Sequence, residues 1–547
     1  MAVTLAELEA VARSHFPSVE RRGDAVVTDV THDSRQVRPG SLFVARRGAR
    51  ADGHAYLEEA LRHGASAVAV ERHVALEAPL LRVPWTTPLC GPWAALVQGR
   101  ASEAMSVVGV TGTNGKTTLT YLLQAACRAG GLRTGLVGTI ETQVGDRCAP
   151  SLLTTPEATD LQRTLAEMRR EGTDVVAMEV SSHGLDQHRV DGTRFDLAIF
   201  TNLEPEHLDY HGTLEHYYAT KASLFGPQFA ERALVCVDDA WGRRLASQTA
   251  LPALTYGADG TGAEVRYRVE ERGLEGLLVV VDGPGGRVAL ESRLVGGINA
   301  PNMVGAYLGA VEVGIDEDQA AAGIAACPRP PGRFQLVELG QPFLVVADYA
   351  HTPHSLNSML ETSRRLTGPH GRVGVVVGAR GGRDREKRQD TGRAAAGADL
   401  AVLTSDSPGP EPPEAILEQL ALGTLGTTGS QVVLEIDRAE AIRRAVTWAR
   451  PGDVVLIVGR GHERHLRWGD RVVAFDDRGV ALDALAGLGY GATHPDGATP
   501  SSARNPAPAA QREAGSARDT GDTPVEPAST EVTGARPPRR RRGDGAG

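Results

Sequence analysis

The stretch Thr111-Gly112-Thr113-Asn114-Gly115-Lys116-Thr117-Thr118 decides the fold of this chain. A short apolar run at 107–110 precedes it, and residues 119–129 follow it with apolar side chains at helical spacing. A strand, a glycine-rich loop and a helix in this order place backbone N–H groups around phosphates at the positive end of a helix. Lys116 is expected to reach the terminal phosphates, and Thr117 or Thr118 is expected to hold Mg²⁺.

The match to the general phosphate-loop pattern is incomplete, because Val110 stands where that pattern has its first glycine. A strand-to-helix turn with chance glycines is the alternative interpretation. Lysine usage favours a phosphate loop, since of 58 Lys and Arg residues only Lys116, Lys221 and Lys387 are lysines. The two side chains differ in shape and titration, so a retained lysine indicates a position where arginine cannot work, unless it survived by chance.

Length and composition restrict the class of protein. A chain of 547 residues predicts three or four domains. The formal net charge of -10 gives no reason to expect a nucleic-acid partner. The N-terminus lacks a signal pattern and no apolar run reaches about 18 residues, so no membrane span is expected. Five cysteines without pairing or metal spacing predict reduced thiols in a cytoplasmic protein: Cys90, Cys127, Cys148, Cys236 and Cys327.

The chain divides into segments of different pattern. Residues 1–104 mix helix and strand signals, with an irregular connection expected at 85–99. Residues 105–328 alternate strands and helices, which predicts a parallel sheet with helical crossovers. Within them, residues 264–295 instead predict antiparallel strands. Residues 329–488 repeat this alternation without a phosphate loop, which predicts a second doubly wound α/β unit.

Residues 489–547 are rich in Ala, Pro, Ser, Thr and Gly, and almost none of them can contribute to a core. This composition predicts a disordered tail. The arginine run at 539–542 indicates a solvated tail rather than a site for acidic lipid or RNA.

Carboxylates and imidazoles gather after two apolar strands of the central segment. Glu179 directly follows one of them, a place that suits Mg²⁺ beside a phosphate loop, although helix capping is an alternative role. Residues 201–211 follow another strand, and there His207 is expected to bind a second metal or orient the substrate, whereas His211 is expected to be structural. Lys221 lies in an expected helix, too far along the chain to be an ordinary phosphate lysine.

These motifs, in this order, resemble the Mur ligase family, the ATP-dependent amide ligases of peptidoglycan precursor synthesis. The resemblance runs from Asp33 to about residue 480. Several further segments resemble the MurE branch of muramoyl-tripeptide synthetases: 33–35, 40–45, 52–54, 154–156, 348–353 and 459–463.

The resemblance implies a three-domain α/β architecture and a reaction in two steps. The N-terminal domain would bind the UDP-linked substrate, the central domain ATP, and the C-terminal domain the amino acid. ATP would phosphorylate the carboxylate of UDP-N-acetylmuramoyl-L-alanyl-D-glutamate, and the amine of a free amino acid would attack the acyl phosphate. A cytoplasmic monomer acting in cell-wall biogenesis, and thereby in cell shape and division, is expected.

The resemblance also assigns roles to residues. The catalytic residues would be Lys116, Lys221, His207 and Glu179, with Lys221 carbamylated by CO₂ so that it joins Thr117, Glu179 and His207 as a ligand of Mg²⁺. ATP would contact Gly112, Thr113, Asn114, Gly115, Lys116, Thr117, Thr118, Asn299, Asn302, Arg333, Asp348 and His351. The uridine nucleotide would contact Ser34, Ala49, Arg50 and Ala51, and the muramoyl-dipeptide Thr154, Thr155, Ser181, Gln187 and Arg189. The incoming amino acid would meet Arg383, Asp406, Ser407, Pro408, Gly409, Gly459 and Glu463.

The acceptor pocket departs from the family pattern. Members that add diaminopimelate read Asp-Asn-Pro-Arg where this chain reads Asp406-Ser407-Pro408-Gly409, and that arginine grips the distal carboxylate. Its absence weakens the case for meso-diaminopimelate, because a bidentate arginine–carboxylate contact is strong. Glu463 remains available for a distal amine. Smaller departures include Glu206 in place of Asp, and Ala379-Arg380 in place of Cys-Gly.

Two alternatives to a peptidoglycan enzyme remain open. A paralogue that ligates an amino acid to a different carboxylate in specialised metabolism is favoured by the altered segment at 406–409. A catalytically inactive binding protein is disfavoured by the intact set of Lys116, Glu179, His207 and Lys221. Dispensability of the gene would favour the paralogue.

Overall fold

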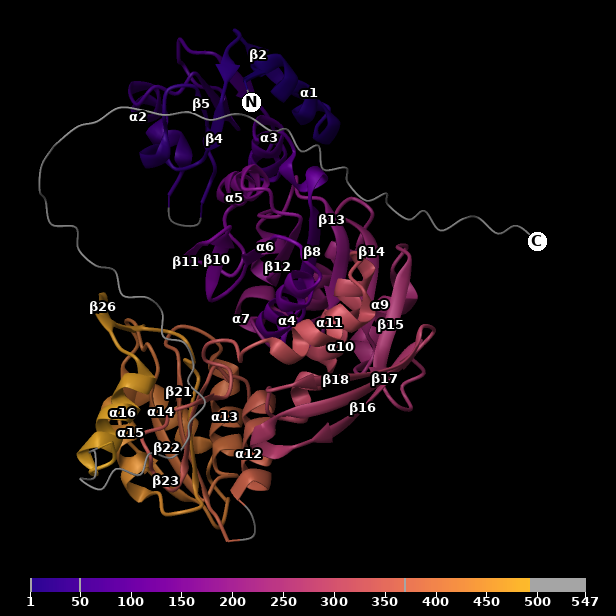
Figure 1. Ribbon diagram of the computed structural model, residues 1–547. Coiled ribbons are helices and arrows are strands. Elements are labelled where there is room, and N and C mark those ends of the chain that lie inside the picture. The colour runs from indigo at the N-terminus through magenta and orange to yellow at the C-terminus, as the bar shows by residue number, and fades with distance from the viewer. Residues whose placement is uncertain (1, 49–50, 368–369, 492–547) are drawn as a thin grey trace, which may run out of the picture. The chain divides into compact units, whose positions relative to one another are not determined.

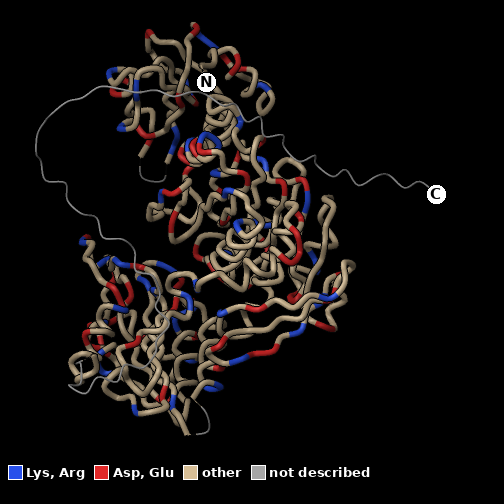
Figure 2. The backbone as a smooth tube through the Cα atoms, in the orientation of Figure 1, with Lys and Arg blue, Asp and Glu red and all other residues tan. Residues whose placement is uncertain are grey.

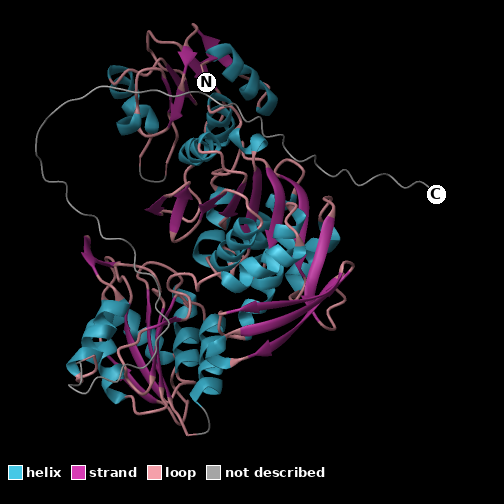
Figure 3. Ribbon diagram, viewed as in Figure 1, coloured by secondary structure: helices cyan, strands magenta, loops and turns pink. Residues whose placement is uncertain are grey.

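The computed structural model describes residues 2–48, 51–367 and 370–491 (Figure 1). From residue 492 onward, the expected disordered tail at 489–547, with its arginine run, lies outside the described residues. Three larger sheets, each accompanied by helices, follow one another along the chain (Figure 3). Among the described residues, no helix is both long and apolar enough to cross a bilayer.

The N-terminal sheet has five strands in the order β2-β7-β6-β5-β4. Only β2 is antiparallel to its neighbour. Its strands are β2 (Glu20–Arg22), β4 (Asp29–Thr31), β5 (Ser41–Val44), β6 (Ala67–Val70) and β7 (Leu80–Arg82), and its helices are α1 (Leu5–His15), α2 (Leu57–Arg62) and α3 (Cys90–Val97). A separate short antiparallel pair is formed by β1 (Val3–Thr4), which precedes α1, and β3 (Val26–Val27), which follows it.

The expected irregular connection at 85–99 is wrong, because most of it is helix α3, entered through a 3-10 turn at Thr87–Leu89. Pro92 stands in the first turn, where a missing N–H breaks no helical hydrogen bond. Trp93 is fully buried, and its indole N–H donates to the carbonyl of Leu8 at 2.9 Å. Pro92 and Trp93 therefore mark a helix start and a core contact rather than a loop.

The central sheet has 11 strands in the order β11-β10-β9-β12-β8-β13-β14-β15-β16-β17-β18. From β9 to β16 neighbouring strands run parallel, and β16, β17 and β18 form the antiparallel extension expected at 264–295. The strands are β8 (Ser106–Thr111), β9 (Thr134–Val137), β10 (Glu141–Val144), β11 (Arg147–Pro150), β12 (Val175–Glu179), β13 (Phe195–Phe200), β14 (Ala230–Cys236), β15 (Ala253–Ala258), β16 (Val265–Glu271), β17 (Leu277–Gly283) and β18 (Gly286–Ser292).

Helices cover both faces of the parallel part of this sheet. On one face α4 packs with α10 and α11 over Val108 and Val110, and on the other Val107 belongs to a core with α5 and α8. The helices are α4 (Lys116–Ala129), α5 (Ala158–Arg170), α6 (Ser182–Asp186), α7 (Leu208–His211), α8 (Leu214–Ala222), α9 (Ala240–Gln248), α10 (Ala300–Glu312) and α11 (Glu317–Ala326). This two-sided burial explains why the interior of β8, residues 107–110, is apolar.

The C-terminal sheet has six strands in the order β19-β20-β24-β21-β22-β23, parallel except for β19. Val375 and Val376 of β21 face different cores, so this sheet is also covered on both sides. Its strands are β19 (Gln335–Leu336), β20 (Leu344–Asp348), β21 (Val373–Ala379), β22 (Leu400–Ser405), β23 (Gln431–Leu434) and β24 (Val454–Val458). Its helices are α12 (Pro353–Thr367), α13 (Arg388–Ala395), α14 (Pro413–Leu422), α15 (Arg438–Trp448) and α16 (Asp477–Gly487), and a hairpin of β25 (His465–Trp468) and β26 (Arg471–Ala474) follows β24.

Candidate active site

The phosphate loop joins β8 to α4 in the middle of the central sheet. Gly112 and Gly115 have φ values of +146° and +89°, which favour glycine. A Cβ on Gly112 would lie 1.9 Å from the hydroxyl of Thr201, and one on Gly115 would lie 2.1 Å from the amide oxygen of Asn302. Asn302 thus lies against the loop that it was expected to serve. Val110, the apparent gap in the motif, is a buried core residue.

Two lysines converge on one carbonyl of this loop. The Lys116 ammonium donates to the carbonyls of Gly112, at 2.9 Å, and Thr113, at 2.8 Å. Lys221, on α8, donates to the same Gly112 carbonyl at 2.8 Å. Burial lowers the pKa of both lysines, and Lys116 lowers that of Lys221 further, to well below its usual range. The sequence separated these residues by about a hundred positions, and the fold brings them together.

Glu179 ends β12 with its carboxylate directed at the first turn of α4. Its Oε1 accepts from the Thr117 hydroxyl at 3.0 Å and from the Thr139 N–H at 2.8 Å, and its Oε2 accepts from the Thr139 hydroxyl at 2.9 Å. Arg333 also donates to the Thr117 hydroxyl, at 3.2 Å. The capping role considered for Glu179 is filled by Ser181, whose hydroxyl accepts the Gly184 N–H of α6.

Imidazoles cluster beside the residues that follow β13. The rings of His207 and His183 meet edge to face with centroids 4.8 Å apart, and burial lowers the pKa of His207 to about 4. A ring nitrogen of His207 and carboxylate oxygens of Asp209 and Asp384 lie within 4.8 Å of one another. The expected metal ligands therefore lie in two groups, Thr117 with Glu179, and His207 with these carboxylates. His211 bonds the hydroxyl of Ser182 at 3.0 Å, which fits its expected structural role.

Glu206 joins this cluster to residues of the C-terminal segment. Its buried carboxylate bonds the His351 ring at 2.7 Å and the Lys387 ammonium at 3.4 Å. Burial alone would raise the pKa of Glu206, but these two partners hold it well below its usual range. The third lysine thus shares Glu206 with His351, the residue that is expected to face the nucleotide.

Asp348 and its neighbours are fixed by the backbone. The Asp348 carboxylate accepts the N–H groups of Phe334, at 2.6 Å, and Ala350, at 2.7 Å. The Arg333 guanidinium stacks 4.7 Å from the centre of the Tyr349 ring. The Asn299 side-chain amide donates to the carbonyl of Val295 at 2.9 Å.

The residues expected to hold the muramoyl-dipeptide lie around Glu179. The Thr155 hydroxyl is buried between the Glu179 carbonyl, at 3.0 Å, and the Ser181 N–H, at 2.9 Å, so its hydrogen bonds are already made within the protein. Arg189 donates to the Thr155 carbonyl at 3.1 Å and to the Gln187 side chain at 2.6 Å. Thr154 lies 3.0 Å from the Thr139 hydroxyl, which connects it to Glu179.

An acidic residue that the sequence did not single out links this region to the N-terminal segment. Glu157 pairs with Arg46 at 2.8 Å and with Arg189 at 3.1 Å. Of the expected uridine contacts, the Ser34 carbonyl bonds His63, and the Ala51 carbonyl accepts the Gly48 N–H. Ala49 and Arg50 lie outside the described residues.

The expected amino-acid residues lie at the carboxyl edge of the C-terminal sheet. Asp406 follows β22 and accepts from the buried Arg460 at 3.0 Å, and Glu463 forms an ion pair with Arg380. Two backbone hydrogen bonds tie Gly409 to the β25–β26 hairpin. The Gly409 N–H donates to the Arg467 carbonyl, and the Gly409 carbonyl accepts the Gly469 N–H.

The remaining acceptor-side residues surround this edge. The Ser407 hydroxyl accepts from Arg460 at 3.3 Å, the Pro408 carbonyl accepts the Glu411 N–H at 3.2 Å, and the Gly459 N–H donates to the Asp348 carbonyl at 3.1 Å. Arg383 is exposed. The pKa of His183 is lowered mainly by burial, then by the charge of Arg189, and to a smaller extent by the charge of Arg383.

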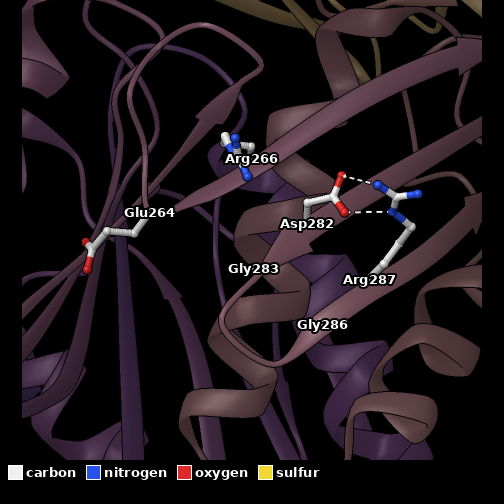
Figure 4. Close-up of a pocket in the computed structure, with 6 residues that line it drawn as sticks. All are labelled: Glu264, Arg266, Asp282, Gly283, Gly286 and Arg287. Atoms are coloured by element: carbon white, nitrogen blue, oxygen red, sulfur yellow. Dashed lines mark hydrogen bonds and ion pairs between the residues drawn. The ribbon is translucent and has the colours of Figure 1, made fainter.

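A surface hollow of the described residues lies elsewhere. It has a volume of about 430 Å³ and is formed by β16, β17 and β18, four strand positions and more from β8 (Figure 4). Its Asp282 is already paired with Arg287, at 2.7 Å (Figure 4). Asp282 also pairs with Arg268. Basic and acidic residues are interspersed in the same way along the rest of the described backbone (Figure 2). The candidate site is therefore the phosphate loop and its partners, not this hollow.

Three family models match successive parts of the chain. They are described as Mur ligase family, catalytic domain (residues 26–101), Mur ligase middle domain (110–310) and Mur ligase, glutamate ligase domain (332–461).

Relatives match across nearly the same length. One from Streptomyces coelicolor, named UDP-N-acetylmuramoyl-L-alanyl-D-glutamate--2,6-diaminopimelate ligase, is 43% identical, covering 85% of this chain and 93% of its own. A protein of the same name from Geobacillus thermodenitrificans is 40% identical, covering 85% and 96%. A solved structure of a ligase with that name has a TM-score of 0.61 at 30% identity, covering 85% and 96%.

A phosphate loop in a parallel sheet, followed by a second α/β sheet, together with these matches defines an ATP-dependent amide ligase. The chain belongs to the Mur ligase family. The fold of a Mur ligase from Thermotoga maritima, solved with ADP, agrees at a TM-score of 0.59 and 21% identity, covering 84% of this chain and 97% of that one.

Proposed function

We propose that this protein ligates an amino acid to UDP-N-acetylmuramoyl-L-alanyl-D-glutamate with ATP, in peptidoglycan precursor synthesis. The relatives named for this reaction support it over most of their length. The observation that carries the proposal is the convergence of Lys116 and Lys221 on the Gly112 carbonyl, beside the Thr117–Glu179 pair. This arrangement suits phosphoryl transfer, in which catalysis consists mainly of positioning and charge neutralisation.

The reaction would use residues of the central sheet for phosphoryl transfer and residues of the C-terminal sheet for the incoming amino acid. Lys116 would neutralise the transferring phosphoryl group while the substrate carboxylate attacks it to form an acyl phosphate. The amine of the incoming amino acid would then attack the carbonyl carbon, the amide bond would form, and phosphate would leave. Thr154, Thr155, Ser181, Gln187 and Arg189 would hold the muramoyl-dipeptide, and Ser34 with residues 49–51 would bind the uridine nucleotide.

On the ATP side, the adenine end would lie against Asn299 and Asn302, and Arg333, Asp348 and His351 would approach from the C-terminal segment. On the acceptor side, Arg383 would take the carboxylate next to the reacting amine, within a pocket formed by residues 406–409, Gly459 and Glu463. ATP and the incoming amino acid would then both lie near the phosphate loop.

The residues at the loop fit Mg²⁺. The Thr117 hydroxyl and the Glu179 carboxylate are the oxygen donors that this ion prefers. Lys221 is 1% exposed and, within the described ranges, forms no ion pair with a carboxylate. Its lowered pKa favours the neutral amine, the form that reacts with CO₂, and the resulting carbamate would supply another oxygen ligand. His207, which lies in the separate group with Asp209 and Asp384, would bind a second ion. The ion at the loop would neutralise phosphate charge.

The five cysteines are free, which fits the reducing cytoplasm that we propose as the location.

A ligation assay tests the proposed function. Purified protein with ATP, Mg²⁺ and UDP-N-acetylmuramoyl-L-alanyl-D-glutamate is incubated with each of a panel of amino acids, and products are identified by mass spectrometry. The expected product has the mass of both substrates less one water. Absence of product with every amino acid, or product with a different carboxylate only, would favour the paralogue in specialised metabolism.

A further inference from the structure

One carboxylate joins the N-terminal segment to the central segment. Glu157 stands directly before α5, and its side chain is 20% exposed. Its Oε2 forms an ion pair of 2.8 Å with Arg46 of the N-terminal segment. Its Oε1 forms an ion pair of 3.1 Å with Arg189 of the central segment. Glu157 therefore holds two guanidinium groups, one from each segment.

Arg46 opens the loop that is expected to bind the uridine nucleotide through residues 49–51. It stands two residues after the end of β5, and its carbonyl accepts the Gly53 N–H at 2.7 Å. A Cβ on Gly53 would lie 2.8 Å from the Arg46 backbone, so the two ends of the loop meet closely. The ion pair with Glu157 thus attaches one end of this loop to the central segment.

The other segment that is expected to contact uridine reaches the same place. His32 directly follows β4 and stands two residues before Ser34. Its Nε2 lies 3.8 Å from the Glu157 carboxylate, and its Nδ1 bonds the Thr159 hydroxyl at 3.3 Å. Both segments on the uridine side therefore contact the start of α5.

Arg189 carries the contact to the dipeptide side. Its guanidinium is 11% exposed and donates to the Thr155 carbonyl at 3.1 Å and to the Gln187 side chain at 2.6 Å. All three residues are expected to hold the muramoyl-dipeptide. Burial lowers the pKa of Arg189, the Glu157 carboxylate raises it, and the charge of Arg46 lowers it. The two guanidinium groups are thus close enough to repel each other, and Glu157 offsets that repulsion.

We propose that Glu157 is a positioning residue that couples the uridine end of the substrate to its dipeptide end. This inference rests on the proposed ligase function. Uridine in its loop fixes Arg46, Arg46 fixes the Glu157 carboxylate, and the carboxylate orients Arg189 for the dipeptide. Without the carboxylate, two mostly buried guanidinium groups lie near each other unpaired, which is unfavourable. Both ends of the substrate then lose contacts.

The test measures both ends of the substrate with the full-length protein. Calorimetry gives Kd for UDP alone, and the ligation assay gives KM for UDP-N-acetylmuramoyl-L-alanyl-D-glutamate and for ATP. Glu157→Gln is expected to raise that substrate's KM about 10- to 100-fold and Kd for UDP about 3- to 10-fold, because charged hydrogen bonds are lost. The values of kcat and of KM for ATP should change little. Glu157→Asp, which keeps the charge, should recover part of the loss.

A double-mutant cycle tests the link itself. Arg46→Gln breaks the same ion pair from the other side, so the double variant with Glu157→Gln should have the same KM as Glu157→Gln alone. Asp160→Asn is the matched control, an acidic residue in the first turn of α5. Its partner Arg163 keeps an ion pair with Asp29, at 3.0 Å, so this variant should change neither Kd for UDP nor KM.

Each outcome decides the inference. Losses that multiply in the double variant, or an unchanged Kd for UDP in Glu157→Gln, would overturn the coupling, as would a wild-type protein that does not bind UDP. Equal losses in kcat and in KM for ATP would mean that Glu157 only supports the fold. If the wild-type protein binds UDP but forms no product with any amino acid, the proposed function fails, while the effect of Glu157→Gln on UDP binding still tests the link on the uridine side.

Discussion

Replacing Lys221 separates what the fold requires from what the reaction requires. The side chain is 1% exposed, and its amino group makes one hydrogen bond, of 2.8 Å, to the Gly112 carbonyl. Arginine cannot lose its proton, so Lys221→Arg would bury an unpaired charge beside Lys116, which costs about 3–5 kcal/mol. Lys221→Met loses one hydrogen bond to a carbonyl that still accepts from Lys116, which costs about 1 kcal/mol. Both variants should lose at least about a hundredfold in ligation rate.

Urea denaturation and the ligation assay measure the two effects separately. The lowered pKa of Lys221 also predicts a pH dependence: between that value and the usual 10.5 the unfolded chain binds a proton that the folded one does not. The stability of the wild type relative to Lys221→Met should therefore rise with pH across this window, measured in CO₂-free buffer. An active Lys221→Arg of wild-type stability, or a relative stability that falls with pH, would refute the reasoning.

Three further predictions concern partners of the site. Thr139→Val removes the hydroxyl that orients Glu179 and should lower the ligation rate about tenfold, measured across a Mg²⁺ titration. Glu206→Gln should lower stability to urea at pH 7 by about 1–3 kcal/mol, because the ionised carboxylate bonds His351; the difference should disappear as pH falls through the lowered pKa of Glu206. Gly115→Ala should lose ATP binding, measured by calorimetry, and about 1–3 kcal/mol of stability.

Matched controls make these outcomes decisive. Gly131→Ala has a similar φ, +81°, but its Cβ would meet nothing within 4 Å, so it should keep ATP binding. Thr142→Val, on neighbouring β10, should leave the Mg²⁺ titration unchanged. Equal ATP binding in Gly115→Ala and Gly131→Ala would contradict the argument for Gly115. An unchanged ligation rate in Thr139→Val would contradict the role of that hydroxyl. A loss of stability in Glu206→Gln that persists at low pH would contradict the argument for the ionised carboxylate.

Local patterns explain which features could be predicted from the sequence. The phosphate loop is a contiguous motif, and inner strands such as β12 and β24 are short apolar runs that are buried on both faces, so their existence could be predicted from the chain alone. The helix at α3 could not be predicted in this way, because Pro92 and Trp93 suggest a loop until the position of Leu8 is known.

Residues whose roles depend on tertiary contacts were missed. Thr139 and Glu157 carry no motif, and only the packing of their segments brings them to Glu179 and Arg189. Arg380 was visible as a departure, but its pairing with Glu463 needs the register of β21 with β22 and the loop after β24. A polar residue directly after a strand is a useful signal in such cases, when that strand lies beside a strand that carries a recognised motif.

The most direct test of the proposed ligase reaction follows the oxygen atoms. UDP-N-acetylmuramoyl-L-alanyl-D-glutamate labelled with ¹⁸O in its reacting carboxylate is ligated in the presence of ATP and Mg²⁺, and the released phosphate is analysed by mass spectrometry. An acyl phosphate transfers one carboxylate oxygen to phosphate, so one ¹⁸O atom per product is expected there. Unlabelled phosphate, or phosphate released without a ligated product, would contradict the account.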